Sequence, residues 1–298
     1  MPVSSKIPFV FFGSSRLSVI VLDQLLSLGY CPSLVVTLPA QLVGRKQILT
    51  QNIVTDWAKS HMVPCYEPEK LDRTFMEIFR TNKLVMEAPF FLVASYSKII
   101  PEEIIAMPTR GVLNIHPSLL PKYRGPAPMP TAMIDDDKNT GVTIMLLDEK
   151  MDHGPIVTQK EITISEWPIY EDFEEMMAKE GAILLAENLE NWITGKITAR
   201  AQDHSRATFT KKITKEDGLL QPGDEPYLNF RKIQAYHGWP QAYFLHQSKD
   251  RLFRVKVTAA SFRDGSLQLI KVLPEGGKAM SYADFVNGYG PADITESV

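Results

Sequence analysis

Short apolar runs alternate with amphipathic helical patterns through the first half of the chain. The run at residues 9–12 is followed by apolar residues at helical spacing from Leu17 to Leu28. Further buried strands are predicted at residues 34–37, 63–66, 90–94 and 112–115, with helical faces over residues 53–58 and 71–79. This alternation predicts an α/β fold in which helices cover both faces of a mostly parallel sheet. Such open sheets bind ligands at the carboxyl ends of their strands.

The second half of the chain follows a different pattern. After a proline-rich loop, strands are predicted at residues 140–147 and 155–164 with no helix between them, which indicates an antiparallel pair. A long helix is then predicted over residues 169–194. Beyond residue 204 the pattern is strand-rich, with short runs at residues 243–245, 252–257 and 267–273. We therefore predict two domains, residues 1–203 and residues 204–298.

The charge is uneven along a chain of otherwise ordinary globular composition. Of 298 residues, 44% are hydrophobic and 22% charged, and the net charge of −3 gives no overall attraction to nucleic acid or anionic lipid. However, residues 1–203 hold 19 Lys and Arg against 25 Asp and Glu, whereas residues 204–298 hold 13 against 10. Any phosphate contact is therefore expected from local patches, above all in the second domain.

The cysteines and the hydropathy indicate the compartment. Cys31 and Cys65 are too few for a disulfide framework and lack zinc-binding spacing. No stretch approaches the roughly 20 apolar residues that cross a bilayer, and the first residues do not resemble a signal peptide. We expect a cytoplasmic protein with no metal and no membrane contact.

Residues 111–125 are the richest in candidate chemistry. Asn114 and His116 end a predicted strand and are two residues apart, so both side chains lie on one face. An Asn amide can stabilise a developing oxyanion, and His can transfer protons near neutral pH. This pair suits acyl-type transfer, although an isolated strand-end His more often has a structural role.

An acidic loop follows about thirty residues later, with Asp148, Glu149 and Asp152 just before Gly154. A carboxylate from this loop could orient the His116 ring and stabilise its charged form. Acidic residues before glycine are also ordinary turn formers. The spacing alone does not choose among the three acids.

Several other site classes are disfavoured. The segment Gly13-Ser14-Ser15 precedes a predicted helix, but it lacks the G-x-G-x-x-G pattern of a dinucleotide site, and Ser14 is expected to act as a helix N-cap. No metal-ligand spacing and no G-x-S-x-G nucleophile motif occurs.

Three segments together resemble the formyltransferase family that uses 10-formyltetrahydrofolate. They are NIHPSLLPKYRG at residues 114–125, TGVTIM at residues 140–145 and MDHGPI at residues 151–156. The resemblance extends to KKITKED at residues 211–217, Trp239-Pro240 and GKAMS at residues 277–281, as in members that act on methionyl initiator tRNA. It implies a Rossmann-like catalytic domain followed by a small β-barrel of the oligonucleotide-binding (OB-like) type.

The resemblance also assigns roles to residues. It implies that the catalytic set is Asn114, His116 and Asp152. It implies folate contacts by Ser118, Leu119, Leu120, Pro121 and the backbone near Tyr96. It implies tRNA contacts by Arg45, Lys46, Lys211 and Lys212.

The chain departs from the family pattern in two places. The loop at residues 39–47 lacks the usual Asp-Arg-Pro start, and the second domain is shortened, with about four strand candidates where such a barrel has five. Three alternatives stay open: formylation of an amino-sugar nucleotide, hydrolysis of the folate to formate, and RNA binding without catalysis. We expect a monomer.

Overall fold

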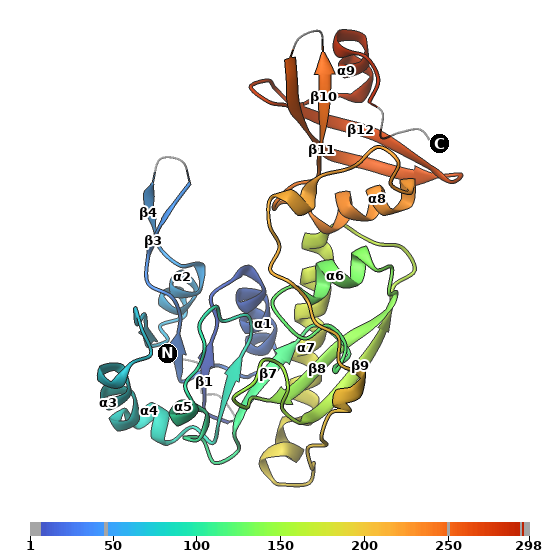
Figure 1. The fold of residues 1–298 in the computed structure, drawn as a ribbon. Helices are drawn as coiled ribbons and strands as arrows, with labels where there is room; N and C mark the ends of the chain where they lie inside the picture. Colours follow the sequence, from blue (N-terminus) through green and yellow to red (C-terminus); the bar gives the residue numbers. More distant parts are fainter. Residues whose placement is uncertain (1–6, 45–46, 249–250, 293, 295–298) are drawn as a thin grey trace. The chain divides into compact units, whose positions relative to one another are not determined.

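The computed structural model describes residues 7–44, 47–248, 251–292 and 294 (Figure 1). It separates into two compact units. The first unit contains residues 1–124, 141–162 and 175–209, and the second contains residues 125–140, 163–174 and 210–298. Residues 204–209 therefore pack with the first unit, and the predicted domain boundary near residue 204 stays a prediction.

A seven-stranded sheet forms the centre of the first unit, in the order β5-β2-β1-β6-β7-β8-β9. Its strands are β1 (Phe9–Phe12), β2 (Leu34–Val36), β5 (Cys65–Tyr66), β6 (Phe90–Val93), β7 (Val112–His116), β8 (Asn139–Leu146) and β9 (Ile156–Thr163). The strands from β5 to β7 are parallel, and β8 runs antiparallel to β7. The predicted mostly parallel sheet is confirmed.

The middle strands are apolar because both faces of the sheet are covered. Every residue of β1, β6 and β7 is buried. Aromatic rings fill the layer beside them: Phe9 stacks on Phe90 at 5.3 Å between ring centroids, and Phe79 meets Phe91 edge-on at 5.8 Å. This rigid core holds the ends of β1, β6 and β7 at one edge of the sheet.

The longer helices of the first unit follow the sequence pattern closely, whereas two four-residue helices were not predicted. The helices of this unit are α1 (Arg16–Ser27), α2 (Ile53–Ser60), α3 (Arg73–Thr81), α4 (Lys83–Met86), α5 (Glu102–Ile105) and α7 (Tyr170–Ile193), the last of which begins in the second unit. The N-cap of α1 is Ser15, so the prediction for Ser14 is wrong by one residue. The reason is Ser18, whose hydroxyl accepts the Ser14 and Ser15 N–H groups and donates to the Ala94 carbonyl at 2.6 Å.

A β-hairpin occupies much of the predicted loop at residues 39–47. Strands β3 (Gln41–Val43) and β4 (Ile48–Thr50) pair antiparallel and project from the first unit (Figure 1). Leu42, Ile48 and Leu49 are exposed on it. Arg45 and Lys46, which the resemblance assigned to tRNA binding, lie outside the described residues.

The second unit combines an antiparallel sheet with helices. It contains α6 (Pro128–Ile134), α8 (Pro226–Ala235), β10 (Tyr243–Ser248), β11 (Arg251–Arg263), β12 (Ser266–Pro274), β13 (Met280–Ser281) and α9 (Tyr282–Tyr289). The four strands pair in chain order, in agreement with the shortened OB-like domain that the sequence predicts. Phe244, Val255 and Phe285 are buried between the sheet and α9. Arg231 on α8 donates to the Ile134 carbonyl at the end of α6, at 2.6 Å.

No helix in the described part of the chain is long and apolar enough to cross a membrane.

Candidate active site

Two polar side chains are buried at the end of β7. Asn114 and His116 have exposed fractions of only 8% and 4%. In the β7–β8 pair, Asn114 lies opposite Met145 and His116 lies opposite Thr143. Both candidates are thus fixed on a central strand at the carboxyl edge of the sheet, which is the ligand-binding edge of α/β folds.

The His116 ring lies between a backbone carbonyl and a carboxylate. Its Nε2 is 3.0 Å from the Tyr123 carbonyl oxygen, and because a carbonyl can only accept, Nε2 carries the hydrogen. Its Nδ1 is 3.7 Å from Oδ1 of Asp152, which is too long for a direct hydrogen bond but close enough for an ion pair when the ring is protonated. Nδ1 is therefore the nitrogen that can exchange a proton.

The loop between β8 and β9 distinguishes the three acidic candidates. Asp148 contacts Nδ1 of His153 at 2.6 Å, Glu149 is exposed, and Asp152 faces His116. Asp152 has a φ of +49°, in the left-handed region. Gly154 is needed here because a Cβ at that position would lie 2.0 Å from the Leu146 carbonyl oxygen. Among these acids, the structure brings Asp152 to His116.

The segment after His116 folds back on β8 through backbone contacts. Thr143 donates its hydroxyl to the Ser118 carbonyl at 2.6 Å and accepts the Leu120 N–H at 3.2 Å. Ser118 and Leu120 are buried, and Leu119 and Pro121 are half-buried. Of the four predicted folate contacts in this segment, two side chains therefore support the fold and two have exposed surface.

Tyr96 is the remaining predicted folate contact, on the loop after β6. Its ring meets Phe12 edge-on at 5.6 Å, and its hydroxyl is buried with no hydrogen-bond partner among the described residues. Burial raises the pKa of Tyr96 to about 12. The Tyr96 side chain thus packs against the core, whereas Ile99 in the same loop is 92% exposed. Lys98 holds the loop by donating to the carbonyls of Pro68 and Glu69.

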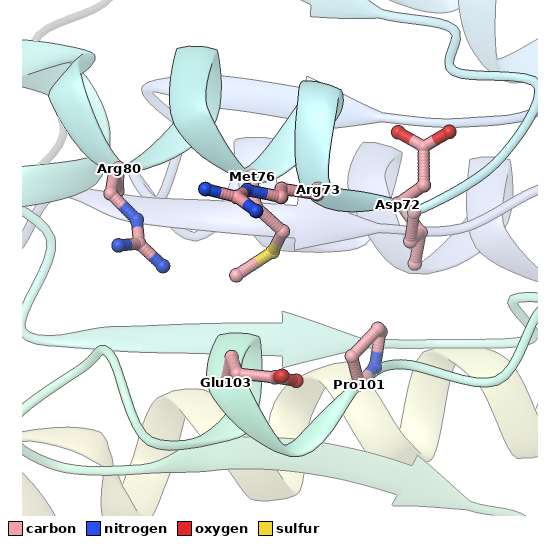
Figure 2. A pocket seen from close by; sticks show the side chains of 7 residues that line it. Asp72, Arg73, Met76, Arg80, Pro101 and Glu103 are labelled. Carbon is pink, nitrogen blue, oxygen red and sulfur yellow. The ribbon is translucent and has the colours of Figure 1, made fainter.

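Two surface cavities lie within the described residues of the first unit. The larger, of about 360 Å³, lies between α3 and α5, with Arg80 and Glu103 projecting from these two helices (Figure 2). The smaller, of about 240 Å³, is lined by Ser14, Pro39, Gln41, Thr50, Gln51, Asn52 and Ile53. Because β1 and β7 are parallel strands of one sheet, this smaller cavity lies at the same edge as His116. Its lining contains no charged residue and combines five polar residues with the apolar Pro39 and Ile53.

The predicted tRNA-binding lysines belong to a different unit from the catalytic candidates. Lys211 and Lys212 are exposed and belong to the second unit, whereas Asn114, His116 and Asp152 belong to the first.

The contact of the Tyr123 carbonyl with His116 could not be predicted from the sequence, because any residue type can supply a backbone acceptor. Among the described residues, no cluster of His, Cys, Asp or Glu could hold a metal ion.

Comparison with known proteins decides the family. The model of the Formyl transferase family matches residues 6–189. The chain belongs to the formyl transferase family. Members of this family use formyl-tetrahydrofolate donors, and a sugar 3N-formyl transferase was solved with dTDP and 5-N-formyl-THF.

Relatives within the formyl transferase family confirm the resemblance to members that act on methionyl initiator tRNA. The chain is 38% identical over 255 residues to a methionyl-tRNA formyltransferase of Listeria innocua, covering 86% of this chain and 79% of the relative. It is 33% identical to a methionyl-tRNA formyltransferase of Halalkalibacterium halodurans, covering 94% of both chains.

Solved formyl transferases share the fold. The methionyl-tRNA formyltransferase from Clostridium thermocellum superposes with a TM-score of 0.58 at 13% identity, covering 90% of this chain and 98% of that one. The sugar 3N-formyl transferase gives a TM-score of 0.62 at 17% identity and covers 88% of each chain. At these identities the structural likeness concerns the fold alone.

Proposed function

We propose that this formyl transferase carries the formyl group of 10-formyltetrahydrofolate to the α-amino group of methionyl initiator tRNA, giving N-formylmethionyl-tRNA for translation initiation. The observation that carries the proposal is the convergence of Asn114, His116 and Asp152 at the carboxyl end of β7. It occurs in a chain 33% identical to a methionyl-tRNA formyltransferase over 94% of both lengths.

The three side chains suit a reaction in which charge develops on a carbonyl oxygen. The donor supplies a formyl carbonyl on N10, and attack by the neutral amine places negative charge on the formyl oxygen. Asn114 donates an amide N–H to that oxygen, and His116 donates from Nδ1 when protonated. Asp152, 3.7 Å from Nδ1, stabilises the protonated ring.

Proton transfer completes the reaction. The attacking nitrogen must lose a proton and N10 must gain one as the bond between the formyl carbon and N10 breaks. His116 serves this exchange through Nδ1, since Nε2 stays bonded to the Tyr123 carbonyl throughout. The ring is therefore held in one orientation while its inner nitrogen cycles between two protonation states.

The residues near β6 and β7 fit a folate. A flat heterocycle needs an apolar surface beside backbone donors and acceptors. Ile99 presents an exposed apolar side chain on the loop after β6, and Leu119 and Pro121 are half-buried after β7. In the proposed site, the pteridine lies along the backbone of residues 96–100, and the segment 118–121 borders the folate.

The acceptor contacts in the proposal come from basic residues. Lys211 and Lys212 are exposed in the second unit, whose sheet also carries Arg254 over the ring of Tyr243 at 4.0 Å. Cations of this kind bind phosphates without sequence readout. We infer that Lys211, Lys212, Arg45 and Lys46 contact the tRNA, and that the protein acts as a cytoplasmic monomer.

The test uses three acceptor conditions with the same formyl donor: methionyl initiator tRNA, an amino-sugar nucleotide and no acceptor. The proposal predicts formylated methionyl-tRNA as the main product, with tRNA affinity that falls steeply as salt rises. Formylation of the amino-sugar nucleotide alone would show that the enzyme performs the same reaction on another acceptor. Formate without an acceptor would indicate a hydrolase, and tRNA binding without folate binding would indicate a non-catalytic module.

A further inference from the structure

A single buried side chain holds the loop that carries Asp152. The Nε2 of Gln202 donates to the carbonyls of Asp152 at 2.9 Å and Gly154 at 2.7 Å. Its Oε1 accepts two hydrogen bonds from Arg124, at 3.1 Å from Nε and 2.6 Å from a terminal nitrogen. Gln202 and Arg124 are 5% and 3% exposed. The amide of Gln202 therefore uses both its donor and its acceptor sides inside the first unit.

The Asp152 loop needs such a tether. The left-handed φ of Asp152 is unusual for a residue other than glycine and persists only where the surroundings impose it. Gln202 bonds the carbonyls on both sides of His153, so one side chain fixes the direction of the backbone that carries the Asp152 carboxylate.

The segment that contains Gln202 also holds the Tyr123 carbonyl, which orients His116. Thr208 accepts the N–H of Tyr123 on its hydroxyl at 2.8 Å and the N–H of Arg124 on its carbonyl at 2.9 Å. Tyr123 also has a left-handed φ, of +59°, and its carbonyl accepts from Nε2 of His116. Residues 202–208, which we call the strap, thus contact the backbone of Asp152 and the backbone of Tyr123. Asp152 is one member of the ion pair, and the Tyr123 carbonyl holds the other, His116.

The strap lies beyond residues 6–189, which the family model matches. We propose that the strap positions the catalytic pair, Gln202 through the backbone of Asp152 and Thr208 through the backbone of Tyr123. Neither residue touches the reacting atoms. The inference rests on the proposed function, because it assigns these residues to the geometry of that reaction.

The expected effect is kinetic, because small displacements at a reacting centre are costly. A misplacement of about 1 Å can reduce a rate about a hundredfold. The 3.7 Å separation of His116 and Asp152 depends on two loops held by the strap. Loosening either tether should lower kcat while leaving substrate binding nearly unchanged.

Gln202→Glu is the sharpest test of the first tether. A glutamate keeps an oxygen for Arg124 but cannot donate to the Asp152 and Gly154 carbonyls. We expect kcat to fall by roughly tenfold to a hundredfold with little change in KM for either substrate. Gln234→Glu is the matched control, since Gln234 donates to the Trp167 carbonyl within the second unit. Gln234→Glu should keep its kcat.

A double-variant cycle separates positioning from general structural support. If Gln202 acts through Asp152, Gln202→Glu should cost little further activity in an Asp152→Asn background. An equal loss in both backgrounds, or an unchanged kcat in a folded Gln202→Glu protein, would overturn the proposal.

Thr208 provides an independent test of the second tether. Thr208→Ser retains the hydroxyl that accepts from Tyr123, and Thr208→Val removes it at nearly the same volume. We expect Thr208→Ser to keep most of the wild-type kcat and Thr208→Val to lose roughly tenfold. Equal activities of the two variants would contradict the role of this hydroxyl.

Amide hydrogen exchange distinguishes failure of the inference from failure of the proposed function. In Gln202→Glu, exchange should increase over residues 147–155 relative to wild type and the Gln234→Glu control, whatever acceptor the enzyme uses. Unchanged exchange there would overturn the positioning role. A wild-type enzyme that formylates no methionyl-tRNA would instead refute the proposed function.

Discussion

The carboxyl end of β7 and the outer face of the second unit's sheet are built in opposite ways. At the end of β7, Asn114 and His116 are almost fully buried, and backbone carbonyls and tethered loops fix their surroundings. On the β10–β11 face, Leu245 and Leu252 are 51% and 58% exposed, and Arg254 lies over Tyr243. Bond-making requires fixed atoms, whereas the phosphate contacts that we propose for the second unit require only a distribution of charge.

This difference explains why Asn114, His116 and Asp152 stand in recognisable motifs, whereas the exposed Leu245, Leu252 and Arg254 do not. Substitutions at the β7 end should therefore reduce turnover, and substitutions in the second unit should change affinity or salt dependence.

Asp152→Asn should reduce the turnover number most. It removes the charge that faces Nδ1 of His116, and loss of a positioned acid–base function typically costs about 10²- to 10⁴-fold. Steady-state formylation kinetics measure the effect. The matched control is Asp148→Asn in the same loop, where the carboxylate contacts His153 instead. Equal losses of turnover in Asp152→Asn and Asp148→Asn would contradict a specific role of Asp152 toward His116.

Phe285→Ala should destabilise the second unit by about 3–5 kcal/mol, the usual cost of removing a buried phenyl ring. Phe285 is fully buried and packs against Phe244 and His246. Thermal unfolding should show the loss, whereas Ile270→Ala on the exposed face of β12 should show little. The KM for tRNA should rise with kcat largely kept. A lower kcat at unchanged KM would contradict the proposal that the β7 end determines turnover and the second unit determines tRNA affinity.

Lys211→Ala and Lys212→Ala should each weaken tRNA binding without changing kcat. Each lost phosphate contact should reduce the salt slope of log affinity by about 0.7 to 0.9. Binding titrations at several salt concentrations measure this slope. Lys83→Ala, an exposed lysine on α4, is the control and should leave it unchanged. An unaltered slope in both variants would remove these lysines from the tRNA contact.

His204 should produce the smallest effect, on stability as a function of pH. Desolvation, followed by the nearby His153 and Arg124, lowers the pKa of His204. Because the folded-state pKa is depressed, the unfolded chain binds the proton more readily, and stability falls as pH drops below about 6.5. His204→Phe keeps a ring against His153 and removes the titration, so the melting temperature should depend less on pH across this window. An identical pH dependence would exclude His204 as a contributor.

The fold was largely predictable because strands buried on both faces are apolar runs. The runs at residues 9–12 and 90–94 correspond closely to β1 and β6. Helix α6 was hidden in a proline-rich loop, since Pro128 and Pro130 fall in its first turn, where the missing N–H groups cost little. The β3–β4 hairpin was missed because its apolar residues Leu42, Ile48 and Leu49 are exposed and give no core-facing pattern.

The candidate site was predictable only in part. The two-residue spacing placed Asn114 and His116 on one face, but the choice of Asp152 required the resemblance to a family. Gln202 is 50 residues from Asp152 in the chain and contacts only backbone atoms of its loop, so no local pattern could reveal it. Tethers of this kind become visible only when the fold brings distant segments together.

The most direct test of the central claim is the single-turnover rate of formyl transfer to methionyl initiator tRNA, with both substrates saturating, for wild type and Asn114→Ala. We expect formylmethionyl-tRNA from the wild-type enzyme and a rate about 10²- to 10³-fold lower in the variant, equivalent to about 2.7 to 4 kcal/mol, with unchanged tRNA affinity. A folded Asn114→Ala enzyme that formylates at the wild-type rate would contradict it.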